Sequence, residues 1–333
     1  MGAQMNSGRR HLLGLHGASA EEIGAILDQA ASLKEISDRA VKKVPALRGK
    51  TVVNLFYERS IRTRTSFEIA AKRLSADTVN IAAEVSSSGK GETLVDTVRN
   101  LAAMAPDVIV LRHPAAGAAH LVAQHVSCPV INAGDGCHEH PTQALLDFMT
   151  IREKRGEIAG LDVAIVGDLL HSRVGRSNLY GLLALGARVR LVGPPTLLPR
   201  EFERLGATLY TDLVAGVRGA DVIMMLRIQR ERQRANMFPS LDEYSRYFCL
   251  TERHVREAHP QVIIMHPGPL NRGIEIATAV ADGPYSVILN QVSNGLAVRM
   301  ATLLLLVHGA RRVAGDADVA EAAEQVAQGD VTA

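Results

Sequence analysis

Tryptophan is absent from this chain of 333 residues, and aromatic residues make up only 4% of it. A base-stacking platform for single-stranded nucleic acid is therefore not expected. The three cysteines show no CxxC spacing, which is typical of free thiols in a reducing cytoplasm. Because the formal net charge is only +2, neither nucleic acid nor an anionic membrane is expected as a partner.

No segment of the sequence has the pattern of an export signal or a membrane span. Two histidines interrupt the apolar stretch that follows Arg9 and Arg10, and Glu21 and Glu22 end it early. The longest apolar run near the end, residues 300–307, is too short to cross a bilayer. We therefore expect a soluble, cytoplasmic protein.

The sequence has the composition of a globular enzyme, with 47% hydrophobic and 22% charged residues. After an amphipathic helix capped by Ser19 and Glu22, strand and helix patterns alternate almost to the end. The strands expected are residues 52–56, 79–82, 108–111 and 130–132, then 163–166, 189–192, 222–226 and 262–265. They are continuous apolar runs, which are typical of parallel strands buried on both faces. The sequence therefore predicts an α/β protein with parallel sheets covered by helices.

The two sets of strands are separated by a charged stretch at residues 152–157. We place a domain boundary there, with a first domain at residues 1–150 and a second at residues 151–290. The tail at residues 313–333 is rich in alanine and acidic, with no lysine or arginine from Gly315 onward. We expect this tail to be disordered.

The segment after the first strand has the layout of an anion site. The first N–H groups of a helix lack internal partners and carry partial positive charge. At this helix start, Ser60 and Thr63 can add hydroxyl donors, and Arg62 can add a planar fork that matches phosphate oxygens. The alternative is a solvated, basic helix start capped by Thr65 and Glu68.

A Gly/Ser-rich loop carries Ser86 and Lys90. It lacks the GxxxxGK[ST] spacing of a nucleotide-binding loop, because Glu92 stands where Ser or Thr is needed. The loop is either a mobile linker or the carrier of a lysine that reaches an anionic ligand.

Polar residues also end the third and fourth strands. Arg112 closes the third strand, and ligands of open α/β sheets bind beyond such carboxyl ends. The segment after the fourth strand contains four residues of types that bind metal ions, Cys137, His138, Glu139 and His140. Residues two apart do not share a helix face and HExxH is absent, so no metal is expected. His140, at a helix entrance, is better suited to donate a hydrogen bond to a bound carbonyl, the alternative being a capping histidine.

Further cations follow strands of the second set. Arg173 lies in a polar segment after one strand, and Arg227 and Gln229 follow another. The alternative for the latter stretch is a solvated basic loop. The segment at residues 266–273 contains two prolines and two glycines, which make it more rigid than an ordinary connecting loop.

Together these groups predict a cleft that binds anions. Five cations in one cleft would repel one another unless the ligands carried about four negative charges. That indicates a phosphate dianion in the first half and a dicarboxylate in the second. With no catalytic triad or metal cluster evident, the reaction needs mainly positioning and charge stabilisation. The cations are Arg62, Lys90, Arg112, Arg173 and Arg227.

Up to about residue 312 the chain resembles the aspartate carbamoyltransferase catalytic chains, within the aspartate/ornithine carbamoyltransferase family. The matching motifs are SIRTRTSFE, SSSGKGE, LRHP, NAGDGCHEHPTQALLD, GDLLHSR, LRIQRER and HPGPLNRG. The resemblance implies transfer of the carbamoyl group of carbamoyl phosphate to the α-amine of L-aspartate, in pyrimidine biosynthesis, without a cofactor. It also implies two doubly wound parallel-sheet domains with helices on both faces, and residues 291–312 returning to the first domain.

The resemblance assigns a role to each candidate residue. The phosphate would be held by Ser60, Ile61, Arg62 and Thr63. The carbamoyl group would be held by Arg112, His140 and Gln143. Arg173, Arg227 and Gln229 would bind the aspartate carboxylates, while Pro267 and Gly268 offer backbone carbonyls. Ser86 and Lys90 would reach in from the neighbouring subunit of a homotrimer. Of these, His140, Arg62, Lys90 and Arg112 would be catalytic.

Ile61 departs from the family, which usually has threonine there, so one hydroxyl donor to phosphate is lost. The nearest rival function is ornithine carbamoyltransferase, whose HCLP and SMG motifs this chain lacks. A non-catalytic scaffold subunit is a further alternative. A dihydroorotase or a regulatory chain could join the trimer, and the sequence does not decide between them.

Overall fold

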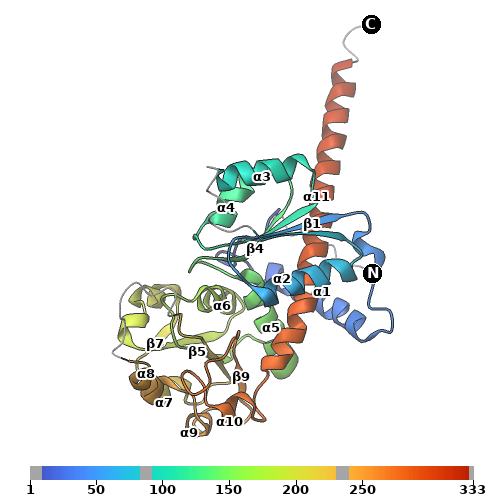
Figure 1. Ribbon diagram of the computed structural model, residues 1–333. Coiled ribbons are helices and arrows are strands. Elements are labelled where there is room, and N and C mark those ends of the chain that lie inside the picture. The colour runs from blue at the N-terminus through green and yellow to red at the C-terminus, as the bar shows by residue number, and fades with distance from the viewer. Residues whose placement is uncertain (1–9, 83–91, 230–239, 330–333) are drawn as a thin grey trace.

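The computed structural model describes residues 10–82, 92–229 and 240–329 of the chain. Figure 1 shows two sheets, one above the other, with the long helix α11 (Ile288–Gly329) running past both. The predicted α/β fold with two parallel-sheet domains is confirmed.

The first sheet has four parallel strands in the order β2-β1-β3-β4. The second has five parallel strands in the order β7-β6-β5-β8-β9. In each sheet the chain winds outward in both directions from the first strand, which makes the fold doubly wound. The strands are β1 (Thr51–Phe56), β2 (Asp77–Ala82), β3 (Val108–His113), β4 (Val130–Asp135), β5 (Asp162–Val166), β6 (Arg188–Val192), β7 (Thr208–Tyr210), β8 (Val222–Met225) and β9 (Ile263–Met265).

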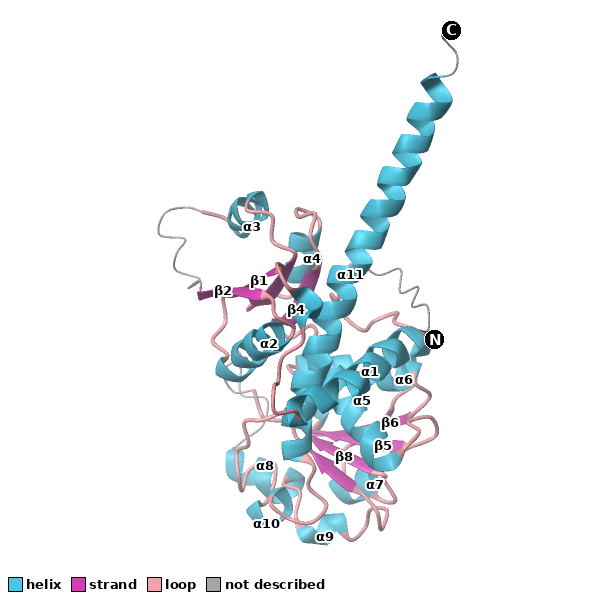
Figure 2. Ribbon diagram, turned by 90° about the vertical axis from the view of Figure 1, so that its right-hand side faces the viewer, coloured by secondary structure: helices cyan, strands magenta, loops and turns pink. Residues whose placement is uncertain are grey.

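Helices connect the strands and cover the sheets, as Figure 2 shows from the side. They are α1 (Ala20–Lys34), α2 (Ile61–Arg73), α3 (Leu94–Ala103), α4 (Ala118–Ala123), α5 (Pro141–Arg155), α6 (Arg173–Ala184), α7 (Leu213–Val217), α8 (Leu241–Phe248), α9 (Glu252–Val255), α10 (Thr278–Ala281) and α11. Short 3₁₀ helices are η1 (Glu35–Asp38), η2 (Pro45–Leu47), η4 (Pro195–Leu197) and η5 (Arg200–Leu205).

Alternate residues of each strand pack into different hydrophobic cores, because side chains of a strand point to opposite faces. In β1, Val53 and Leu55 pack into a core with α3 and α4. Val52 packs on the other face, into a core that also contains Val163 of the second sheet. The two halves therefore share one hydrophobic core. A third core lies between the second sheet and the layer of α7 and α8.

One strand, β7, was not predicted from the sequence. It has only three residues at the sheet edge, and its side chains are exposed or half-buried. Such a short strand has no continuous apolar run that distinguishes it from a loop.

The helix α11 continues to Gly329 and includes most of the acidic tail. The expected disorder of residues 313–333 stays a prediction. Earlier in its course α11 packs against α1, α2 and α5. The division at residue 150, with residues 291–312 joining the first domain, remains our proposal, which this packing supports.

The first half of α11 is apolar enough to satisfy the length and composition of a membrane span at Ile288–Gly309. However, 61% of that apolar window is buried inside the protein. Burial in the shared core therefore accounts for the apolar character of this helix.

Candidate active site

The candidate site lies where loops from the two sheets face each other. All strands of a parallel sheet present their carboxyl ends at one edge, and ligands bind there at the point where the strand order reverses. In the first sheet this point lies between β1 and β3, and in the second between β5 and β8. The predicted residues follow these strands or their immediate neighbours.

The start of α2 forms the phosphate side of the candidate site. Ser60 is the N-cap, and its hydroxyl accepts a hydrogen bond from the Thr63 N–H at 3.4 Å. The Ile61 side chain is 80% exposed, whereas Thr63 is buried. The helix start therefore presents backbone N–H groups and a positive dipole end, as an anion site requires.

Arg62 reaches from this helix start to the second half of the chain. A Cβ built on Gly268 would collide with the Arg62 guanidinium, so the arginine lies against the turn after β9. Burial, and next the nearby charge of Arg227, lower the pKa of Arg62. The structure thus brings Arg62, Arg227 and Gly268 together, although they are far apart in the sequence.

Glu58, which the sequence analysis overlooked, joins two more of the predicted cations. Its Oε1 accepts hydrogen bonds from Arg112 Nη2 at 2.5 Å and from Arg173 Nη2 at 2.7 Å. Its Oε2 accepts from Arg173 Nη1 at 3.0 Å. A carboxylate of the protein therefore offsets part of the positive charge that the sequence prediction balanced with the anionic ligands. A sequence signal existed, since Glu58 is the acidic residue that directly precedes the Arg-rich helix start.

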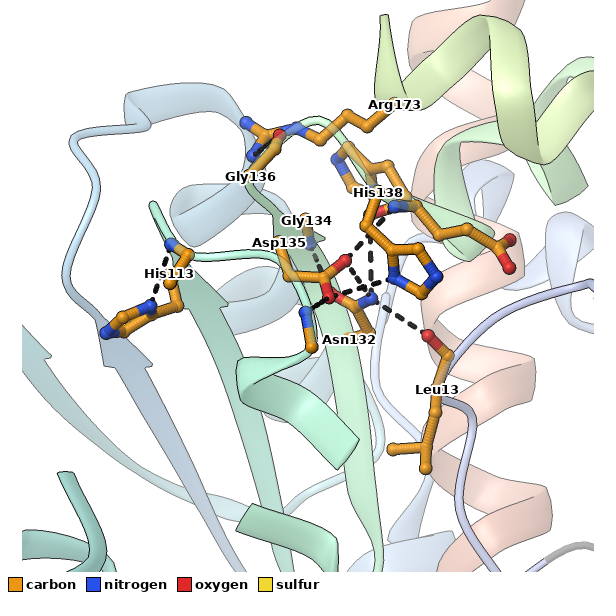
Figure 3. A network of polar contacts seen from close by, with 12 residues as sticks. Leu13, His113, Asn132, Gly134, Asp135, Gly136, His138 and Arg173 are labelled. Carbon is orange, nitrogen blue, oxygen red and sulfur yellow. Dashed lines mark hydrogen bonds and ion pairs between the residues drawn. The ribbon is translucent and has the colours of Figure 1, made fainter. Parts of the chain in front are cut away.

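The loop after β4 is held by a network of hydrogen bonds around Asp135, which Figure 3 shows. Asp135 Oδ1 accepts from Asn132 Nδ2 at 2.7 Å and from the Glu139 N–H at 3.1 Å. Its Oδ2 accepts from the Gly117 N–H at 2.8 Å and lies 3.0 Å from His138 Nδ1. This buried carboxylate fixes the loop that leads to His140.

His140 is held by groups that the sequence analysis also overlooked. The His140 N–H donates to Ser177 Oγ at 2.9 Å, and that hydroxyl donates to Glu139 Oε2 at 2.8 Å. His140 is only 4% exposed, and its side chain makes no capping hydrogen bond to α5. The alternative of a capping histidine therefore has no support in this geometry. One turn later, Gln143 donates to Asp147 Oδ1 at 3.2 Å.

The second half contributes a loop after β8 and a turn after β9. Arg227 is half-buried and donates to Gln229 Oε1 at 3.3 Å, unlike a residue of a solvated loop. In the turn, the Gly268 N–H donates to His266 Nδ1 at 2.8 Å, which fixes the backbone around Pro267. Ser86 and Lys90 lie outside the described residues.

A metal site was not predicted, but the fold brings His120 close to Asp135 and His138. One ligand-type atom from each lies within 4.8 Å of the others. Each carboxylate oxygen of Asp135 already contacts two other groups of the loop network. Hydrogen bonding to Asp135 raises the pKa of His138, so this histidine is better described as one partner of an ion pair than as a metal ligand.

Comparison with known proteins decides the family. Residues 10–153 match the carbamoyl-phosphate binding domain of aspartate/ornithine carbamoyltransferases, and residues 159–306 match the aspartate/ornithine binding domain. The chain belongs to the aspartate/ornithine carbamoyltransferase family. It is 60% identical over 304 residues to the aspartate carbamoyltransferase catalytic subunit of Syntrophotalea carbinolica, covering 91% of this chain and 97% of that one. It is 59% identical over 295 residues to the corresponding subunit of Geobacter sulfurreducens, covering 88% and 95%.

Solved structures of both carbamoyltransferase types are similar. The aspartate transcarbamoylase of Trypanosoma cruzi in complex with N-(phosphonacetyl)-L-aspartic acid superposes with a TM-score of 0.80 and 32% identity, covering 88% of this chain and 94% of that one. The ornithine carbamoyltransferase of Pyrococcus furiosus gives a TM-score of 0.78 and 33% identity, with coverage of 88% and 96%. The fold alone therefore does not select the amino-acid substrate.

Proposed function

We propose that this carbamoyltransferase transfers the carbamoyl group of carbamoyl phosphate to the α-amine of L-aspartate, giving N-carbamoyl-L-aspartate and phosphate. Catalytic subunits of aspartate carbamoyltransferases that are 55–60% identical over nearly their whole length support this function. A structural neighbour from Trypanosoma cruzi binds carbamoyl phosphate together with aspartate. The observation that carries the proposal is the convergence of Arg62, Arg227 and Gly268 from the two halves.

The phosphate of the substrate would bind at the start of α2. Backbone N–H groups at Ile61 and its neighbours, the Ser60 and Thr63 hydroxyls and the Arg62 guanidinium would bind its oxygens. Ser86 and Lys90 of a neighbouring subunit would complete this side. We therefore propose a homotrimer in which neighbouring subunits share active sites.

The carbamoyl group would bind between Arg112, His140 and Gln143 on one side and the carbonyls of Pro267 and Gly268 on the other. The amine nitrogen attacks the carbamoyl carbon, the carbon–oxygen bond to phosphate breaks, and the proton lost by the amine leaves with phosphate. Negative charge grows on the carbonyl oxygen during attack. Arg112 and His140 are donors suited to stabilise it.

Aspartate would bind through its two carboxylates to Arg173, Arg227 and Gln229. Two guanidinium groups fit a dicarboxylate, and a cationic side chain such as that of ornithine would be repelled. Ornithine is the second candidate substrate, because ornithine carbamoyltransferases share the fold. A non-catalytic scaffold subunit is a weaker alternative, since it would not need this set of residues.

An assay of product formation tests the proposal. The purified protein with carbamoyl phosphate should form carbamoyl-aspartate from aspartate and little citrulline from ornithine. Preferential formation of citrulline would reverse the proposed specificity, and no product from either amino acid would reject the activity.

We also propose a cytoplasmic protein that uses no cofactor or metal and has no nucleic-acid or membrane partner. A dihydroorotase or a regulatory chain is a possible partner of the trimer. Native mass spectrometry of the purified protein tests the subunit number, with three copies expected.

A further inference from the structure

A buried carboxylate, that of Asp147 in α5, lies behind the proposed carbamoyl site. The residue has no exposed surface. Its Oδ1 accepts hydrogen bonds from Gln143 Nε2 at 3.2 Å and from Gln291 Nε2 at 2.8 Å, and its Oδ2 accepts from Asn178 Nδ2 at 2.8 Å. The three amides come from α5, α11 and α6. A carboxylate is suited to this place because it only accepts hydrogen bonds.

Gln291 extends this connection to the turn after β9. Its Nε2 faces Asp147, while its Oε1 accepts a hydrogen bond from the His266 N–H at 3.0 Å. His266 directly precedes Pro267 and Gly268, and its Nδ1 accepts the Gly268 N–H at 2.8 Å. The position of this turn is therefore tied to Asp147 through a single side chain.

The same carboxylate determines which end of the Gln143 amide faces a ligand. Because Gln143 Nε2 donates to Asp147, the side-chain carbonyl oxygen of Gln143 is the end of the amide that can face a ligand in the site. A carbonyl oxygen accepts hydrogen bonds, as do the backbone carbonyls of Pro267 and Gly268. All three acceptors match a carbamoyl nitrogen, which carries two N–H donors.

We propose that Asp147 is a positioning residue for the carbamoyl nitrogen, holding Gln143 directly and the Pro267 turn through Gln291. The inference rests on the proposed function. Burial raises the pKa of Asp147 to about 7, whereas the hydrogen bonds from its three amide partners and the charge of Arg299 favour the ionised carboxylate. In the ionised form both oxygens of Asp147 are available to the three amides.

The test compares carbamoyl phosphate with inorganic phosphate as ligands of the Asp147→Asn variant. Asparagine has the same size, but its amide nitrogen would face donors. We expect kcat/KM for carbamoyl phosphate to fall roughly 10- to 100-fold. The affinity for inorganic phosphate, which lacks the carbamoyl group, should change less than about twofold. Equal losses for both ligands would overturn the proposal.

Thr150→Val provides a matched control. It removes another buried hydrogen bond between α5 and α11, that from Asn294 Nδ2 to Thr150 Oγ1 at 3.0 Å, without touching Gln143. Its kcat/KM should stay within about twofold of wild type even if the melting temperature falls. A loss as large as that of Asp147→Asn would make Asp147 merely a structural link between helices.

A double-mutant cycle measures the coupling between Asp147 and Gln143 directly. Once Gln143→Ala has removed one positioned amide, Asp147→Asn should cause a smaller further loss. Losses that multiply would contradict a shared role. If Asp147→Asn does not fold, Gln291→Ala replaces it in the test. We expect the same selective loss of kcat/KM for carbamoyl phosphate. An unchanged kcat/KM in Gln291→Ala would contradict the proposal. A wild-type protein without activity would reject the proposed function, whereas an active wild type with an equally active Asp147→Asn rejects only this inference.

Discussion

Gly268 matters because it has no side chain. Its φ of +64° is unfavourable for other residues, and a Cβ would collide with the Arg62 guanidinium. The positive φ and the close approach of the Arg62 guanidinium therefore both favour glycine at this point.

Gly268→Ala should displace Arg62 from the phosphate side and lower kcat/KM for carbamoyl phosphate roughly 10- to 100-fold. Gly273→Ala is the matched control, because Gly273 has a φ of +80° but no atom within 4 Å of a Cβ. The control carries similar backbone strain without the collision. Equal losses in steady-state kinetics of both variants would assign the effect to strain instead of to Arg62.

Asp147 gives a prediction about pH. Burial raises its pKa from 3.8 to about 7. Between these two values the folded chain binds the proton more strongly than the unfolded chain, so this residue makes the unfolding free energy fall as pH rises. Asp147→Asn removes that slope. We therefore expect the difference in melting temperature, variant minus wild type, to increase from about pH 5 to about pH 8. Differential scanning fluorimetry measures this difference. A difference that stays constant with pH would contradict the raised pKa of Asp147.

At the scale of elements, Glu58 connects the loop after β1 to β3 and to the start of α6. It holds Arg112 and Arg173, which are 9% and 4% exposed. Removing its charge leaves two buried guanidinium groups without their carboxylate, which is costly.

Glu58→Gln should lower kcat/KM for aspartate roughly 100-fold, because Arg173 loses its orientation. Glu68→Gln serves as the control, since Glu68 forms an exposed pair with Lys72 on α2 that is worth little. Kinetics of Glu58→Gln equal to those of the control would show that Glu58 does not orient the site.

The sequence predicted those elements whose signal is local. Continuous apolar runs located strands of both sheets, and polar residues at their ends located Arg62, Arg112 and Arg227. The partners of these residues were not predictable in the same way. Glu58 meets Arg173 across a separation of 115 residues, and Ser177 meets His140 across 37. Only the packing of the two sheets brings such pairs together.

The end of α11 is an element without an assigned role. Figures 1 and 2 show it extending away from both sheets. A helix without tertiary packing is marginal in water. Deleting residues 313–333 should therefore leave kcat/KM and the melting temperature nearly unchanged, and a clear loss of either would show that the tail contacts the protein or a neighbouring subunit.

At the scale of the whole molecule, the two sheets form one unit. They share a hydrophobic core that contains Val52 of β1 and Val163 of β5. The candidate residues of both halves meet beside this core, with Arg62 against the turn that carries Gly268. Two subsites from two domains suit two substrates that must be held together for direct transfer.

Calorimetric titration with N-(phosphonacetyl)-L-aspartic acid, the ligand of the Trypanosoma cruzi complex, tests this central claim most directly. The molecule joins a phosphonate to an aspartate moiety and should bind once per chain with far higher affinity than either substrate. Arg62→Ala in the first half and Arg227→Ala in the second should each weaken binding at least about 100-fold, while Thr150→Val binds like wild type. Unchanged affinity in Arg227→Ala would show that the second half is not part of the site and would contradict the account.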